Sequence, residues 1–186
     1  MMQHVLIPTD FTIESLNLLK AAATMNTRPK RIILFHAVEL TDSITELLFF
    51  SKSAFIESIS NKDFVTASKI IHNRYASTIT SVEIDLFIGR GHRAFENFVA
   101  GNGVDLIVIP EAYTFRMPSN RSVDPLRFIH RTGKRIRMIS WKRRDDVAED
   151  SLSGIFQFDP ELKATPTMQE PYEPLNGSSP EHSRKA

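Results

Sequence analysis

Residues 105–110 read Asp-Leu-Ile-Val-Ile-Pro, a short and almost unbroken apolar run. Such runs are typical of strands that are buried on both faces of a parallel sheet. In α/β proteins, ligands bind in the loops that follow these strands, and loops that hold phosphate commonly need glycine. Here the following loop, residues 111–122, reads EAYTFRMPSNRS, and no glycine occurs between Gly103 and Gly133. The run therefore predicts a strand whose following loop lies where ligands are commonly bound, but this loop lacks the glycines that usually hold phosphate.

The rest of the first 140 residues alternates short apolar runs with segments of helical spacing. Strands are expected over residues 5–7, 32–38, 82–88, 105–110 and 136–139. Helices are expected over residues 13–23, 64–75, 95–99 and 123–129. Thr9, Asp10 and Thr12 are expected to cap the first helix. Strands that alternate with helices predict an α/β domain with a parallel sheet.

Length and composition limit the possible classes of protein. The chain has 186 residues, 41% of them hydrophobic, which suits one α/β domain with a tail. A formal net charge of +1 gives the whole chain no nucleic-acid or membrane signal. The absence of cysteine excludes disulfides, thiolate metal sites and cysteine catalysis. Because no leader-like or membrane-length apolar run is evident, the sequence predicts a soluble, cytoplasmic protein.

The chain divides into two parts by composition. Residues 1–144 carry the alternating pattern, interrupted by an unusually apolar insertion at about residues 41–61. Residues 145–186 begin with an acidic patch and continue rich in proline, so this tail is expected to be mostly irregular. Its apolar cluster at residues 155–158 is a candidate for docking on the domain. The insertion is expected either to cover the crevice beside the sheet or to extend a contact between two copies.

Three segments of this pattern resemble the universal stress protein family. Residues 4–22, HVLIPTDFTIESLNLLKAA, look like its opening strand, its Pro-Thr-Asp-Phe turn and its first helix. Residues 32–39, IILFHAVE, are similar to its second strand, and residues 82–110 resemble the stretch from its third strand to its fourth. The resemblance implies an open parallel five-stranded sheet with helices on both faces, the adenine nucleotide alpha hydrolase-like fold.

Family members that bind ATP carry a Gly-x2-Gly-x9-Gly-Ser/Thr motif after the fourth strand, and this chain departs from it. Aligned to the motif, Pro110 and Tyr113 stand at the first two glycines, and Val123 and Asp124 stand where Gly-Ser is expected. Arg121-Ser122 would stand there instead only if the loop is two residues short, and on either alignment all three glycines are absent. Proline has no backbone N–H to donate, and tyrosine and valine add bulk where the backbone must approach a phosphate. The chain is thus expected to be a divergent member that does not bind ATP in the family manner, and we expect no cofactor.

Two further positions match family contacts in part. Asp10 matches the acid near the adenine, and Ala37 stands where a valine often donates backbone contacts. Asp10 lies at the carboxyl end of the first strand, where it either lines a ligand crevice or caps the next helix. A nucleotide or small anion in a modified crevice would be contacted by Asp10, Ala37, Arg116, Arg121 and Ser122.

Other polar features allow both a functional and a structural interpretation. Gly89-Arg90-Gly91-His92 is either a small anion loop at a helix N-terminus or a tight turn between a strand and a helix. His36 lies within an apolar strand and is expected to be a core histidine with a hydrogen-bond partner. No histidine spacing suggests a metal site.

A basic stretch concentrates between residues 116 and 144, with ten lysines and arginines. It is either a surface for anions or nucleic acid, or the solvated faces of a helix and an edge strand. Aromatic residues are sparse within it, which favours the solvated faces, so nucleic acid is not expected as a partner. Arg135 and Arg137 alternate with apolar residues, as in a charged edge strand.

These features favour a non-enzymatic stress-response or regulatory module that acts through protein contacts. In the family the last strand often pairs with its twin, so a homodimer is expected through Ile136, Met138, Ile139 and Trp141. The alternative is the nucleotide or small-anion binding described above. An enzyme is not expected, because the sequence shows no nucleophile–base pair and no metal cluster.

Overall fold

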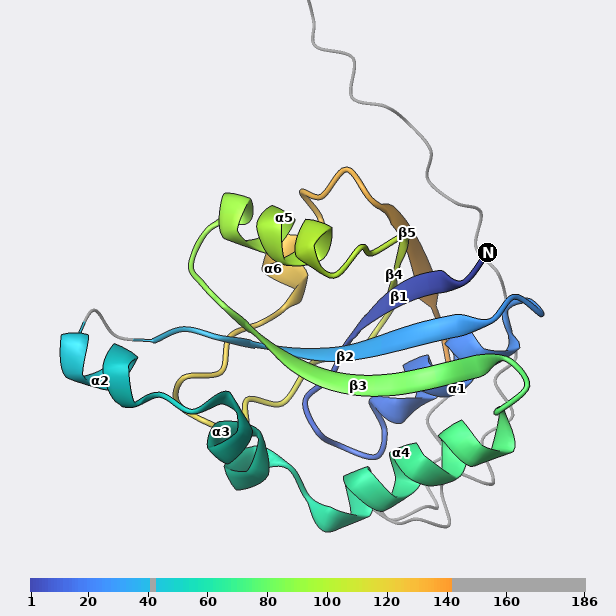
Figure 1. Ribbon diagram of the computed structural model, residues 1–186, viewed down its shortest axis with the longest axis horizontal. Helices are drawn as coiled ribbons and strands as arrows, with labels where there is room; N and C mark the ends of the chain where they lie inside the picture. Colours follow the sequence, from blue (N-terminus) through green and yellow to red (C-terminus); the bar gives the residue numbers. More distant parts are fainter. Residues whose placement is uncertain (41–42, 142–186) are drawn as a thin grey trace, which may run out of the picture.

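The computed structural model describes residues 1–40 and 43–141, which form one five-stranded sheet (Figure 1). Its strands are β1 (Gln3–Pro8), β2 (Lys30–Val38), β3 (Ile79–Ile88), β4 (Leu106–Pro110) and β5 (Arg135–Ile139). Their order is β3-β2-β1-β4-β5, and every pairing is parallel. The predicted open, five-stranded parallel sheet is therefore confirmed. The order in which strands are added to the sheet changes side between β1 and β4, so the carboxyl ends of these two strands form the topological switch point.

Helices cover both faces of the sheet (Figure 1). On one face lie α1 (Leu16–Thr24) and α4 (Lys62–Arg74), and on the other lie α5 (His92–Gly101) and α6 (Leu126–Ile129). Successive residues of β1 point to opposite faces, so Val5 and Ile7 join the core under α1 and α4 while Leu6 joins the core under α5 and α6. This two-sided burial explains why residues 5–8 of β1 and all of β4 are apolar.

The insertion after β2 forms two short helices, α2 (Ile44–Phe49) and α3 (Lys52–Ile59). Helix α3 is attached to the sheet, because Phe55 packs with Val38 and Leu86 at the ends of β2 and β3. Helix α2 lies at one extreme of the molecule, away from β4 and β5 (Figure 1). Two functions were expected for the insertion. Helix α2 does not fit the first of them, covering the crevice, because its large apolar side chains are exposed.

The start of the first helix differs from the prediction. Helix α1 begins at Leu16 rather than near Ile13, and Ser15 at its N-cap makes no side-chain capping bond. The expected capping of this helix by Asp10 is wrong, because the Asp10 carboxylate bonds to Thr12 and to the loop after β4 instead. Helix α6 is likewise shorter than predicted, and Pro125 occupies its N-cap.

One glycine in the helix-to-strand connections has a clear structural requirement. Helix α5 ends at Gly101, and Gly103 beyond it has a φ of +61°. A Cβ atom at Gly103 would also lie 3.2 Å from the Nδ1 atom of His4. The position therefore needs glycine for both its backbone conformation and its space. The predicted tail, its apolar cluster and the basic residues 142–144 lie outside the described residues.

Candidate functional site at the carboxyl ends of the strands

The Asp10 side chain, which follows β1, is 2% exposed and has four hydrogen-bond donors around its carboxylate. Its Oδ1 atom accepts from the backbone N–H of Thr12 at 3.1 Å and from the Thr12 hydroxyl at 2.7 Å. Its Oδ2 atom accepts from the Tyr113 hydroxyl at 2.7 Å and from the backbone N–H of Arg116 at 2.8 Å. The carboxylate is thus satisfied from within the chain.

Tyr113 occupies the switch point between β1 and β4. Its hydroxyl contacts both Asp10 and Thr12, the latter at 2.9 Å. Its ring lies edge-on to Phe115 with a centroid distance of 5.1 Å, and Phe115 is buried in the core. Tyr113 is the residue that stands at the second glycine of the ATP motif. A side chain therefore lies on Asp10 at the place where the sequence departs from that motif.

The second half of the loop pairs with the end of β2. The backbone N–H of Val123 donates to the carbonyl of Ala37 at 3.0 Å, and the N–H of Glu39 donates to the carbonyl of Arg121 at 2.9 Å. Val38 and Ser122 form an antiparallel bridge between these two bonds. Ala37 is fully buried. The backbone beside Ala37, which the resemblance places near a ligand, is thus engaged by the chain itself.

His36 and Ser122 form a partly buried contact that sequence reasoning missed. The His36 Nδ1 atom lies 2.7 Å from the carbonyl oxygen of Thr9, and its Nε2 atom lies 2.8 Å from the Ser122 hydroxyl. This arrangement fits a neutral ring that donates from Nδ1 and accepts from Ser122 at Nε2. Burial lowers the pKa of His36 and keeps it neutral, although the Thr9 carbonyl acts in the opposite direction. The expectation that His36 is a core histidine with a partner agrees with these contacts.

A strained residue covers His36. Phe11 has a φ of +62° although it is not glycine, a conformation that costs roughly 1–3 kcal/mol and clusters at functional sites. Its backbone N–H donates to the Thr9 hydroxyl at 3.1 Å. Its ring lies 5.4 Å from the His36 ring and 5.3 Å from the Phe64 ring of α4. Burial of the Phe11 ring between these two offsets the strain.

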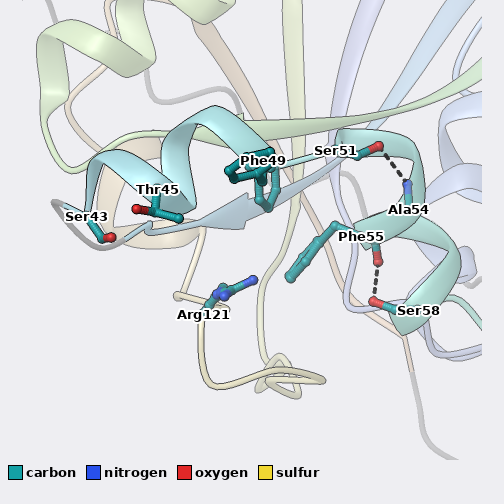
Figure 2. A pocket seen from close by; sticks show the side chains of 9 residues that line it. Ser43, Thr45, Phe49, Ser51, Ala54, Phe55, Ser58 and Arg121 are labelled. Atoms are coloured by element: carbon teal, nitrogen blue, oxygen red, sulfur yellow. Dashed lines mark hydrogen bonds between the residues drawn. The ribbon is translucent and has the colours of Figure 1, made fainter.

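The two arginines of the loop lie in different places. Arg116 is exposed, and its backbone rather than its side chain contacts Asp10. Arg121 lines an open groove of about 620 Å³ beside α2 and α3. In Figure 2, Arg121 points into this groove together with Phe49 and Phe55. The structure therefore does not bring the side chains of Asp10, Arg116 and Arg121 to one point.

The Gly89–His92 turn is held by neighbouring acidic residues. Arg90 pairs with Glu39 at 2.6 Å and also donates to the carbonyl of Leu40 at 2.9 Å. His92 lies 3.2 Å from Glu96, one turn further along α5. Arg127 of the basic stretch shares Glu39 at 3.3 Å and stacks over the Phe128 ring. These contacts fit the structural interpretation of both features.

The four residues predicted for a dimer strand have different surroundings. Ile139 is buried in the core of its own chain. Trp141 packs against Tyr113 with a centroid distance of 5.5 Å and donates to Glu14 at 3.4 Å. Ile136 is partly buried against the opposite core, and Met138 is 38% exposed. Of the four side chains, Met138 is the one that most clearly faces solvent at this edge.

Within residues 1–40 and 43–141, no cluster of three or more His, Asp or Glu side chains could hold a metal ion. None of the helices in these same ranges has the length and apolar character needed to cross a membrane.

No protein-family model matches the chain, and no curated protein matches it significantly. Among solved structures, a universal stress protein in complex with cAMP is 16% identical, with a TM-score of 0.43 over 74% of this chain and 96% of that one. A universal stress protein family member from Burkholderia pseudomallei is 13% identical, with a TM-score of 0.45 over 74% and 95% of the two chains. UspA from Lactobacillus plantarum is 12% identical, with a TM-score of 0.45 over 73% and 96%. No function follows from likenesses at this level.

The Tyr113 hydroxyl gives an expected dependence of stability on pH. Burial, followed by the charge of Asp10, raises the pKa of Tyr113 above its usual value of about 10. Above pH 10 the unfolded chain loses this proton while the folded chain keeps it, so stability falls as the pH rises. Near pH 10 the tyrosine of the unfolded chain is only partly ionised, so the slope should stay below the one-proton limit of about 1.4 kcal/mol per pH unit.

Urea denaturation of the wild type and of Tyr113→Phe, at pH 8.5 and pH 10.5, measures this effect. At pH 8.5 the variant should be less stable by about 1 kcal/mol, the value of one hydrogen bond. At pH 10.5 the difference should shrink, because only the wild type has this ionisation to lose. An equal difference at both pH values would contradict the assignment.

Proposed function

We propose that this chain is a stress-response or regulatory module of the universal-stress-protein type, which acts through self-association and protein contacts. We further propose that it does not bind ATP as the ATP-binding members do. The three sequence segments that resemble the family support the type of protein. The observation that carries the second part is the contact of the Tyr113 hydroxyl with Asp10 at the switch point.

Binding a nucleotide in this place would require several contacts to break. The Tyr113 hydroxyl and the Arg116 N–H would have to leave Asp10, and hydrogen bonds to a charged group contribute about 1.5–3 kcal/mol each. The backbone pairing of residues 121–123 with β2 would also have to open if the ligand used the Ala37 backbone. Pro110 offers no N–H to a phosphate in return. The balance of these contacts therefore favours the arrangement without a nucleotide, in which the 111–122 loop is bonded to Asp10 and to β2.

Calorimetric titration of the full chain with Mg²⁺ and ATP tests this proposal. We expect no saturable heat at tens of micromolar ATP, and no nucleotide retained by protein purified from its host when it is examined by native mass spectrometry. A micromolar Kd for the wild type that Arg121→Ala weakens would overturn the proposal. That result would favour the alternative, a small-anion binding protein with a modified crevice.

The self-association that we propose uses β5, the edge of the sheet. Within the described residues, β5 pairs only with β4, which leaves its outer N–H and C=O groups for a second copy. Met138 is exposed on this strand, whereas Ile139 and Trp141 are engaged inside their own chain. Arg135 and Arg137 weaken the edge through like-charge repulsion if two strands pair closely. A charged side chain at Met138 is the change that would disrupt this contact selectively.

The proposal includes no catalysis. His36 and Ser122 form a histidine–serine pair, but His36 is 1% exposed and both of its ring nitrogens have partners. The Ser122 hydroxyl also accepts from the backbone N–H of Ser119 at 3.2 Å. These bonds attach the loop to β1 and β2, which is a sufficient role for the pair.

A further inference from the structure

Helix α2 combines a short length with large exposed apolar side chains. Ile44, Leu47, Leu48 and Phe49 are 74%, 54%, 75% and 82% exposed. The helix has six residues, and isolated helices shorter than about 12 residues are marginal in water. Helices in proteins are stabilised mainly by burial of an apolar face, and α2 buries little of its own. Its conformation therefore calls for a surface that covers it.

The exposed side chains of α2 form two neighbouring faces with different shapes. Ile44 and Leu48 are four residues apart and make an apolar ridge. Thr45 and Phe49 are also four residues apart, and they line the groove of about 620 Å³ together with Phe50 and Phe55 (Figure 2). A projecting apolar ridge thus lies beside a groove whose aromatic side chains come from both α2 and α3, with Arg121 and several Ser and Thr residues at its walls.

We propose that α2 and the groove beside it form a self-association surface, and that its occupant is α2 of a second copy of this chain. A two-fold interface uses the same patch on both partners, so that patch must contain both a projection and the hollow that receives it. The ridge of Ile44 and Leu48 from each copy would enter the groove beside Phe49 of the other.

The area of the patch agrees with such an interface. At these exposures, the four large side chains of α2 present on the order of 500 Å² of apolar surface, at about 150–250 Å² for a full aromatic side chain. That is near the upper end for the largest patch on an ordinary monomer. Two such patches together would bury on the order of 1,000 Å², which is the lower limit for a specific interface. This surface is separate from the β5 edge, so the inference does not depend on the proposed β5 contact.

Light scattering on the full chain, at tens of micromolar, tests the two surfaces separately. The α2 variant is Leu48→Glu with Phe49→Glu, and the matched edge variant is Met138→Glu. If both surfaces operate, the wild type exceeds a dimer, each variant falls to a dimer, and the combined variant is monomeric. An α2 variant with the same mass as the wild type overturns the α2 inference, whatever Met138→Glu does. A Met138→Glu variant with unchanged mass overturns the β5 contact instead.

A cross-linking experiment gives a second readout that does not depend on particle mass. The chain has no cysteine, so Leu48→Cys introduces a single thiol. Under mild oxidation, an equal mixture of Leu48→Cys and Phe49→Cys should form mixed disulfide-linked dimers at least tenfold faster than a mixture of Leu48→Cys and Lys69→Cys, whose control position lies on the exposed side of α4. Equal rates for the two mixtures would overturn the inference. Because residues 48, 49 and 69 are all exposed, circular dichroism should show that all three variants keep the wild-type fold.

Discussion

Replacing Asp10 with alanine is expected to lower the free energy of unfolding by about 3–4 kcal/mol, one of the largest effects of any polar substitution in the described chain. The carboxylate accepts four hydrogen bonds while 2% exposed, and the variant leaves those donors without their acceptor. The loss is less than the sum of four bonds, because the hydroxyls of Thr12 and Tyr113 lie 2.9 Å apart and one can donate to the other once the carboxylate is removed. Urea denaturation followed by far-UV circular dichroism measures the change.

Two matched variants separate the contributions to this loss. Asp10→Asn keeps one oxygen but places an amide group where an acceptor stood, so it should be destabilised by an intermediate amount. Asp124→Ala removes an exposed carboxylate that accepts one bond, from the N–H of Leu126 at 2.9 Å, and should cost about 1 kcal/mol. If Asp10→Ala were no more destabilised than Asp124→Ala, the arrangement of the 111–122 loop would not depend on the Asp10 carboxylate.

The Asp10 contacts illustrate where sequence reasoning succeeded and where it failed. The position of Asp10 at the carboxyl end of a buried strand could be predicted, because apolar runs followed by polar turns are local signals. The capping of α1 by Asp10 was also a local inference, and it was wrong. A hydroxyl 103 residues away supplied a partner, and no spacing rule connects Tyr113 with Asp10.

The same distinction applies to the loop as a whole. The absence of glycine from this loop was evident from the sequence, and it led to the expectation that the loop differs from an ATP-binding one. The sequence did not indicate which groups the loop would contact instead. Ser122 lies 86 residues from His36 in the sequence. Residues 121–123 pair with the end of β2 through their backbone atoms, and the type of side chain does not predict such bonds. Both contacts follow from the fold rather than from residue type.

The insertion shows a third kind of limit. Its apolar composition left two roles open, covering the crevice or extending a contact between two copies. Phe55 is 9% exposed within one copy, whereas the large apolar side chains of α2 are exposed. Composition states that apolar surface must be covered, but it does not state by which molecule. In the proposed pairing of two α2 helices, the molecule that covers the apolar surface of α2 is a second copy of the chain.

The largest expected effect of an apolar substitution is at Phe95, in the core beneath α5. Phe95 is fully buried, and its ring lies 5.0 Å from that of Phe87, 5.6 Å from Phe35 and 5.8 Å from Phe128. Phe95→Ala should lower the free energy of unfolding by about 3–5 kcal/mol, through lost burial and the cavity left behind. Because Phe128 belongs to α6, the cavity also loosens the helix that follows the 111–122 loop.

Phe49→Ala is the matched control, since it removes the same side chain from a site that is 82% exposed. In dilute protein, where a second copy contributes little by mass action, it should change stability by less than about 0.5 kcal/mol. If α2 pairs between copies, the loss of stability caused by Phe49→Ala should grow as the protein concentration rises. The loss of stability caused by Phe95→Ala includes the same core cavity at every concentration. Urea midpoints measured at two protein concentrations therefore distinguish a core residue from an interface residue. A deficit below about 1.5 kcal/mol for Phe95→Ala would mean that the aromatic cluster does not act as one packed unit.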